Sequence, residues 1–288
     1  MQVGDVVINV VSDGTWWQDA GAHFGLVPRV LWEPLVALDD RHRVRMALNC
    51  LLIRSSGRTI LVDTGLGSKL SEKERRKFGV QGPYRLLEHL EELGVLPEDV
   101  DIVINTHLHS DHSGGNTILN SHGRPVPTFP RAEYWIQRLE WADARYPNER
   151  TSKTYLPENL APLEDSGQLR LLYGDTRVTP QVRCLVTPGH TRAHQSVGIE
   201  SQGQTALYLG DLAPWKENIE KLSWTLAADV APLETMESKR AVRRWAIEED
   251  ALLFLEHDPR FAAGVLRQYA DTLKLEPIDI HNENDPAS

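Results

Sequence analysis

Residues 105–115 read NTHLHSDHSGG and place three histidines and one aspartate within six positions. The apolar run directly before them, residues 100–104, is typical of a buried strand, and the Gly114-Gly115 pair after them is a point where a helix can start. Imidazole nitrogens and carboxylate oxygens are ligands that Zn²⁺, Mn²⁺, Fe²⁺ and Co²⁺ accept. The stretch therefore predicts a metal site at the end of a strand.

The spacing of these side chains predicts two groups of ligands. In an extended loop, His107 and His109 point to the same side and can hold one ion. If the chain then turns into a helix, Asp111 and His112 turn toward a second, neighbouring ion. The alternative is a polar loop that happens to be rich in histidine, and four ligands at this spacing behind an apolar strand disfavour it.

Composition narrows the class of protein. A chain of 288 residues can bury a large core, and its formal charge of -10 disfavours a nucleic-acid-binding surface. No stretch approaches the ~20 apolar residues needed to span a bilayer, and the N-terminus lacks the features of a signal peptide. We therefore expect a soluble, cytoplasmic protein. Cys50 and Cys184 lie in apolar runs and are expected to be buried free thiols.

Apolar runs and helical periodicity predict a protein of mixed α/β class. Residues 3–11 are rich in Val and Ile, and residues 46–54 and 59–62 flank a hairpin signal at Ser55-Ser56-Gly57. We expect further strands at residues 131–136, 182–186, 195–199, 205–209 and 251–255, and helices at residues 84–93, 137–144, 238–249 and 260–273. Residues 1–275 are predicted to form one domain, followed by an acidic tail at residues 276–288.

Residues 15–45 hold many aromatic and apolar side chains at no clear period, together with Gly and Pro. A long irregular stretch of this kind is often a lid or a contact surface, and we expect a lid or a dimer contact here. The alternative is a loop whose aromatic side chains simply pack on the core.

Candidate ligands recur where strands end. His107, His190, Asp211 and His257 each follow an apolar run closely, and loops at one edge of a sheet can converge on a shared site. The two halves of the chain look alike, which suggests two similar sheets packed face to face with helices outside. Asp63 also ends a strand, before Gly65, and is either a turn residue or a group that orients a ligand histidine.

These motifs resemble those of the metallo-β-lactamase superfamily. The resemblance covers roughly residues 45 to 260 and is carried, in chain order, by ILVDTG at 60–65, HLHSDH at 107–112, PGHT at 188–191, GD at 210–211, and His257. FGLVP at 24–28, LWE at 31–33 and LNCLLI at 48–53 resemble the branch that holds quorum-quenching N-acyl-homoserine lactonases and methyl parathion hydrolase.

The resemblance implies an αββα sandwich of two mixed sheets and two divalent metal ions per chain. Zn²⁺ is the expected metal, with Fe, Mn and Co as alternatives. By position, His107, His109 and His190 would hold the first ion; Asp111, His112 and His257 the second; and Asp211 would bridge them. The resemblance also favours the role of Asp63 as a group that orients a ligand histidine. His194 is expected to be a hydrogen-bonding core histidine, and His23, His42, His89, His122 and His281 surface or packing residues.

In this family two ions share a water and lower its pKa from ~15.7 toward neutrality, which supplies hydroxide for attack on a carbonyl or phosphoryl centre. Asp211 and Asp111 are the expected catalytic carboxylates, and Asp111 is also placed to carry a proton to the leaving group. Several acyl-homoserine lactonases have a substrate-binding tyrosine three residues after the bridging aspartate. Here that position is Pro214, followed by Trp215, which departs from their pattern.

An apolar wall for the substrate is predicted from the early aromatic segment and from the residues after Asp211. Its candidate members are Trp16, Phe24, Leu26, Trp32, Trp215, Leu222 and Trp224. Such a wall suits an acyl chain or an aryl group better than a charged substrate. Each of these side chains could equally pack within the core.

Five functions remain open at this point. The first is a lactonase acting on a small-molecule lactone or ester, and the second a phosphotriesterase resembling methyl parathion hydrolase. The third is a glutathione thioester hydrolase or a single-iron persulfide dioxygenase. An RNA-processing nuclease is disfavoured by the acidic charge, and a binding scaffold by a ligand count beyond the four that a structural site needs. A homodimer is the expected assembly.

Overall fold

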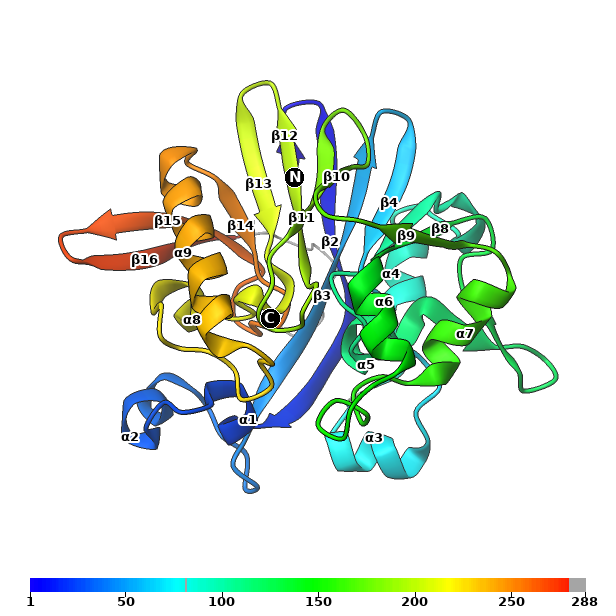
Figure 1. Cartoon of the computed structure of the whole chain (residues 1–288), viewed down its shortest axis with the longest axis horizontal. Coiled ribbons are helices and arrows are strands. Elements are labelled where there is room, and N and C mark those ends of the chain that lie inside the picture. The colour runs from blue at the N-terminus through cyan, green and yellow to red at the C-terminus, as the bar shows by residue number, and fades with distance from the viewer. Residues whose placement is uncertain (81, 280–288) are drawn as a thin grey trace.

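Two large β-sheets lie face to face in the centre of the molecule, and helices cover their outer sides (Figure 1). The computed structural model describes residues 1–80 and 82–279. This arrangement confirms the predicted αββα sandwich. Within the described residues, no helix combines the length and the hydropathy needed to cross a membrane.

The first sheet comes from the N-terminal half of the chain and is mixed. Its strands are, in spatial order, β1 (Gln2–Val3), β2 (Val6–Asp19), β3 (Arg43–Ser55), β4 (Arg58–Val62), β5 (Ile102–Ile104), β8 (Glu133–Gln137) and β9 (Leu169–Leu172). β1 to β4 pair antiparallel, and β4, β5, β8 and β9 run parallel to one another.

The second sheet comes from the C-terminal half and is also mixed. Its strands are β10 (Thr176–Arg177), β11 (Val182–Val186), β12 (Gln195–Ser201), β13 (Gln204–Tyr208), β14 (Leu252–Phe254), β15 (Ala263–Tyr269) and β16 (Thr272–Ile278). β13 and β14 are parallel and the other neighbours antiparallel. A small hairpin, β6 (Thr117–Leu119) and β7 (Pro125–Pro127), stands apart from both sheets.

Helices alternate with the strands along the chain, and several of them pack on the outer faces of the two sheets. The α-helices are α1 (Ala20–Phe24), α2 (Arg29–Trp32), α3 (Glu72–Phe78), α4 (Leu86–Glu92), α5 (Ser110–Ser113), α6 (Arg138–Arg145), α7 (Pro157–Asp165), α8 (Lys216–Glu220) and α9 (Pro232–Glu248). Single 3₁₀ turns are η1 (Glu33–Leu35), η2 (Pro97–Asp99), η3 (Gly114–Asn116) and η4 (Gly210–Leu212).

Three apolar layers hold the sandwich together. Side chains such as Leu51 and Ile104 of the first sheet meet Val197 and Phe254 of the second in the central layer. A second layer lies between the first sheet and the helices α4, α6 and α7, and a third between the second sheet and α8 and α9. Cys50 and Cys184 are buried free thiols, as predicted.

The predicted helix at residues 260–273 is wrong, because this region forms the β15–β16 hairpin. Its connecting turn is Ala270-Asp271, with Ala270 at φ 47°, and it lacks the Asn-Gly or Asp-Gly pair that marks most short hairpins. Ala, Leu, Arg and Gln favour helix, but pairing of β15 with β14 outweighs that preference. β16 reaches Ile278, so residues 276–278 belong to the sheet and not to a tail; residues 280–288 lie outside the described part of the chain.

The aromatic segment is shorter than predicted, because strands extend into both of its ends. β2 continues to Asp19 after an irregular step between Ser12 and Thr15, and β3 starts at Arg43. Only residues 20–42 leave the sheet, where they form α1, α2 and η1. In Figure 1 this part lies at the lower end of the strands.

Two backbone segments touch where the short helix α5 of the histidine motif ends. Thr64 N donates to His112 O and Gly114 N donates to Gly65 O, both at 2.8 Å. A Cβ atom on Gly114 would lie 2.0 Å from Leu66 O, although the φ of Gly114, -60°, suits any residue. Gly114 is therefore required by the close approach of the two segments rather than by its conformation.

Replacing Gly114 tests this contact. Gly114→Ala should lower the free energy of unfolding by about 1–3 kcal/mol, because the extra methyl group separates two hydrogen-bonded backbones. Urea unfolding measures the change. In Gly21→Ala, at an exposed position of α1, the new methyl group meets only the Asp19 carboxylate and should not destabilise the protein. Equal stability of the two variants would contradict this account.

Candidate metal centre

The predicted ligands come from segments that follow four different strands. The chain reaches His107 and His109 after β5, and Asp111 and His112 in α5. It reaches His190 after β11, Asp211 in η4 after β13, and His257 after β14. The loops after strands of both sheets thus converge on one place.

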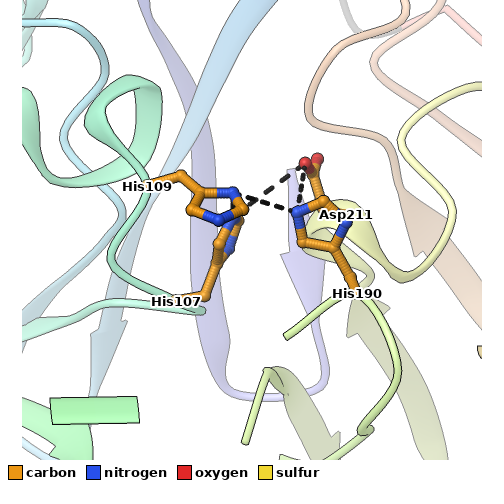
Figure 2. A group of neighbouring side chains, drawn as sticks. All are labelled: His107, His109, His190 and Asp211. Carbon is orange, nitrogen blue, oxygen red and sulfur yellow. Dashed lines mark hydrogen bonds and ion pairs between the residues drawn. The ribbon is translucent and has the colours of Figure 1, made fainter. Parts of the chain in front are cut away.

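The first group of side chains joins the two halves of the chain. Ligand atoms of His107, His109, His190 and Asp211 all lie within 4.8 Å of one another. His109 Nδ1 lies 3.0 Å from His107 Nε2 and 3.1 Å from His190 Nε2. His190 Nε2 lies 3.1 Å from Asp211 Oδ2. Figure 2 shows the two histidines of the first half facing His190 and Asp211 of the second.

The second group lies beside the first and shares Asp211 with it. His112 Nε2 and His257 Nε2 are 3.2 Å apart, and His257 Nε2 lies 3.2 Å from Asp211 Oδ1. Asp211 thus turns Oδ2 toward His190 and Oδ1 toward His257. Oδ2 also lies 3.6 Å from His112 Nε2, so Asp211 faces both groups, and a carboxylate in this position could hold two cations together.

Two further carboxylates approach the second group, from opposite sides of His112. Asp111 lies 3.9 Å from His112 Nε2 and 3.7 Å from His257 Nε2, on the side of the ligand nitrogens. Glu256 lies 2.9 Å from His112 Nδ1, behind the ring. Glu256 has the residue type of a ligand, but this position makes it a group that orients His112, while Asp111 faces the candidate cation.

The outer ring nitrogens determine which nitrogens are free to bind a metal. His190 Nδ1 donates to Asp229 at 2.8 Å, and His257 Nδ1 donates to Ala47 O at 2.7 Å. A neutral imidazole whose outer nitrogen carries the proton has its lone pair on the inner nitrogen. The inner nitrogens of His112 and His257 face each other at 3.2 Å, where they could share a proton or be held together by a bound cation. The donor set fits a pair of divalent cations.

Charge in the site also favours cations. Burial disfavours a charged ring on His257, but Asp211 and Glu256 outweigh it and raise its pKa to about 9. Burial and the neighbouring histidines hold the pKa values of His107 and His109 well below the usual range, so these rings are neutral and their lone pairs are available.

Asp63 supports the histidine motif from behind. Its carboxylate accepts from Thr106 N at 2.8 Å and from Thr106 Oγ1 at 2.6 Å, and it lies 3.2 Å from His112 Nδ1. Asp63 has a φ of 57°, a left-handed conformation that is strained for a residue with a side chain. The contacts match the predicted role of a residue behind a ligand. Burial and the neighbouring Asp63 carboxylate raise the pKa of Glu256 to about 8.

Most of the predicted substrate wall gathers in one aromatic cluster next to the metal centre. The cluster includes Trp16, Phe24, Trp32, Trp215 and Trp224. Phe24 stacks on Trp32 with ring centroids 4.7 Å apart. Leu26 is wrong as a wall residue, because the loop between α1 and α2 turns its side chain fully into solvent (100% exposed). Leu222 is half-buried outside the cluster.

Two buried residues near the site, Asp229 and Glu256, escaped prediction. Asp229 lies in a stretch whose pattern gives no sign of a partner, whereas Glu256, adjacent to His257 at a strand end, carried a usable signal. His23, predicted to be a surface or a packing residue, is a packing residue. His23 is fully buried against Phe24 and Trp215, and burial lowers its pKa to about 3.

The other histidines divide between confirmed and corrected predictions. His194 is a buried hydrogen-bonding residue, as predicted: its Nε2 accepts from Asp211 N and its Nδ1 lies 2.9 Å from Thr187 Oγ1. His89 was predicted to have no partner nearby, but its Nδ1 accepts a hydrogen bond from Ser12 N. His281 lies outside the described residues.

Comparison with known proteins decides the family. The model of the metallo-β-lactamase superfamily matches residues 44–257. The chain belongs to this superfamily. It is a metal-dependent hydrolase, because the matched span carries all seven predicted ligands.

Its relatives include proteins named for one reaction. An N-acyl homoserine lactonase of a Bacillus species is 30% identical over 220 residues, which cover 73% of this chain and 80% of that protein. The crystal structure of a probable metal-dependent hydrolase from Staphylococcus aureus has a TM-score of 0.86 at 28% identity and covers 97% of this chain and all of its own. A dizinc quorum-quenching lactonase shares the fold at 20% identity, with a TM-score of 0.79 over 98% of this chain and 97% of its own.

Removal of the Asp229 carboxylate should weaken the first group without touching a ligand. In Asp229→Ala the outer nitrogen of His190 loses its acceptor, and we expect zinc affinity to fall about 10- to 100-fold. Competition with a chromophoric chelator measures it. Asp143→Ala, which breaks only the exposed pair with Arg192, is the matched control. Unchanged affinity in Asp229→Ala would show that His190 is held by packing alone.

Buried His23 should make the metal-free protein sensitive to acid. Its folded pKa of about 3 lies below its unfolded value of about 6.5, so the unfolded chain gains a proton first and stability falls as the pH drops from 6.5 toward 3. Between pH 7.5 and 5.5, the wild type should lose about 1.4 kcal/mol more than His23→Phe. Urea unfolding in chelator at both pH values measures this, and identical losses in the two proteins would refute it.

Proposed function

We propose that this protein is a lactonase that opens N-acyl-homoserine lactones at a centre of two divalent cations, with zinc as the metal. The observation that carries the proposal is the bridging arrangement of Asp211, with one carboxylate oxygen in each group of histidines. Relatives at 29% and 30% identity that are named N-acyl homoserine lactonase support this substrate class.

When bound, the two ions supply Lewis acidity that activates water and polarises a carbonyl. The chain's own contribution begins with position. Asp211 lies between the two groups of candidate ligands. Asp229 holds the ring of His190, and Glu256 and Asp63 hold the ring of His112. Because these groups are fixed before substrate arrives, they need no rearrangement during the reaction.

Asp111 is the carboxylate placed to move a proton. Its side chain is 17% exposed, against 9% for Asp211 and none for His112, so it lies toward solvent at the mouth of the site. An oxygen of Asp111 can accept a proton from water and return it to the alkoxide that leaves when the lactone ring opens.

The segment after α1 provides a surface for a homodimer. Leu26, Val30, Leu31 and Leu35 expose 100%, 75%, 56% and 40% of their surface on one short stretch. A cluster of exposed apolar side chains of this size favours association with a second copy.

Loss of one ligand tests the proposal. Metal-loaded wild type should hold close to two ions per chain and open N-hexanoyl-homoserine lactone. His109→Ala should lose metal and turnover together, because His109 Nδ1 faces both His107 and His190. His122→Ala, at an exposed turn, is the control and should keep both. Elemental analysis and a lactone assay measure the outcome.

A panel of substrates separates the competing reactions. Faster turnover of a methyl-parathion analogue than of any lactone would replace the proposal with a phosphotriesterase. A single iron per chain with activity on a glutathione persulfide would replace it with a dioxygenase. Full activity in His109→Ala would refute the metal centre itself.

A further inference from the structure

Lys239 is a fully buried lysine in the middle of α9. Lysine side chains are almost never fully buried unless they are paired, because removing a polar group from water costs free energy. An apolar side chain would fill the same space at a lower cost. The contacts of the Lys239 ammonium group should therefore show what the lysine is needed for.

The ammonium group of Lys239 binds the segment that connects α8 to α9, residues 221–231, which we call the α8–α9 loop. Nζ donates to Trp224 O at 2.8 Å and to Lys221 O at 3.2 Å. Burial lowers the pKa of Lys239 to about 7, although the charge of nearby Asp229 opposes this change. A neutral amine still has two N–H groups, so both contacts persist whether or not the side chain is charged.

The α8–α9 loop supports His190 through both its ring and its backbone. Asp229, in this loop, accepts from His190 Nδ1 at 2.8 Å. Val230 N donates to His190 O at 3.1 Å, and Ala231 N donates to Gly189 O at 2.9 Å. The position of the loop therefore sets the direction in which His190 Nε2 faces the candidate cation.

Only a few residues of the loop separate Lys239 from Asp229. Leu226 N, two residues after the carbonyl of Trp224, donates to Asp229 Oδ2 at 3.3 Å. Contacts thus run from the lysine through the loop to the carboxylate that holds the outer nitrogen of His190. Loss of the lysine would free the start of this path.

Other contacts hold the loop at Ala227, which is exposed. Its N–H donates to Ala22 O at 3.0 Å, and its carbonyl accepts from Arg150 at 2.6 Å. Water can replace a partner lost from an exposed position more easily than one lost from the interior. Without the lysine, Trp224 O would keep the longer contact with Asn218 Nδ2, at 3.4 Å, but lose the shorter one.

We propose that Lys239 is a positioning residue for the metal centre, because it fixes the α8–α9 loop and, through Asp229, the ring of His190. The inference rests on the centre of two cations proposed above, and it holds whichever lactone the enzyme opens. It makes metal affinity depend on a side chain that binds the loop rather than the metal.

Replacement of the lysine tests this through metal affinity. Lys239→Met keeps the apolar part of the side chain but removes the donor. It should lower the affinity for Zn²⁺ about three- to tenfold, less than Asp229→Ala, because the loop keeps its other contacts. Competition with a chromophoric chelator measures the affinity. The visible absorption of bound Co²⁺ should also change, because it reports the ligand geometry around the ion.

A double-mutant cycle shows whether the lysine acts through Asp229. In Asp229→Ala the His190 ring has already lost its acceptor, so adding Lys239→Met should change Zn²⁺ affinity by about twofold or less. Should Lys239→Met fail to fold, Lys239→Gln allows the same cycle. Because glutamine keeps an N–H donor, this variant should lose less affinity than Lys239→Met.

A control in the same helix separates positioning from loss of stability. Val242, also in α9, packs in the apolar layer of the second sheet. Val242→Ala should destabilise the protein through lost packing, but leave both the Zn²⁺ affinity and the Co²⁺ spectrum unchanged.

The outcomes are distinguishable. Unchanged Zn²⁺ affinity and an unchanged Co²⁺ spectrum in Lys239→Met would overturn the inference. Equal losses in the wild-type and Asp229→Ala backgrounds would also overturn it, since the lysine would then act by another route. A wild type that binds no Zn²⁺ would overturn the metal centre itself. If the predicted losses occur in a protein that opens no lactone, the inference stands and only the proposed substrate is wrong.

Discussion

The arrangement of the site depends on histidine nitrogens that are held face to face. His112 Nε2 and His257 Nε2 are 3.2 Å apart, and the outer nitrogens of the two rings face Asp63 and Ala47 O. Neither ring can turn away without leaving a buried acceptor unpaired, which costs more than a typical hydrogen bond contributes. The fold thus holds candidate ligand nitrogens close together before any cation arrives, so a bound metal would add to the stability of the folded state.

The two halves of the chain share this constraint. The first sheet delivers His107, His109, Asp111 and His112, and the second delivers His190, Asp211 and His257. The apolar layer between the sheets sets how closely these loops approach. Because neither half supplies a complete set of ligands, metal binding and packing of the sheets stabilise one another. The backbone contact at Gly114 fixes the histidine motif within the first half.

Local sequence patterns predicted many of the strands and the candidate ligands that the structure brings together, since both leave a periodic or compositional signal. Patterns failed where partners are distant in sequence. Residues 260–273 have helix-forming composition, and only pairing with β14 makes them a hairpin. Asp229 lies 39 residues from the His190 ring that it orients, and no spacing rule links them. For His23 the sequence left surface and packing positions open, because burial by Trp215, far along the chain, has no local trace.

The candidate ligands and the aromatic side chains beside them come from different kinds of segment. The metal ligands sit at strand ends, where a change of backbone would disturb two sheets at once. The aromatic cluster draws instead on residues 20–42, which leave the sheet and contact the site through side chains. Substitutions in this segment can therefore change the surroundings of the site without moving a candidate ligand. Within one fold, this lets the substrate range diverge while the reaction stays the same.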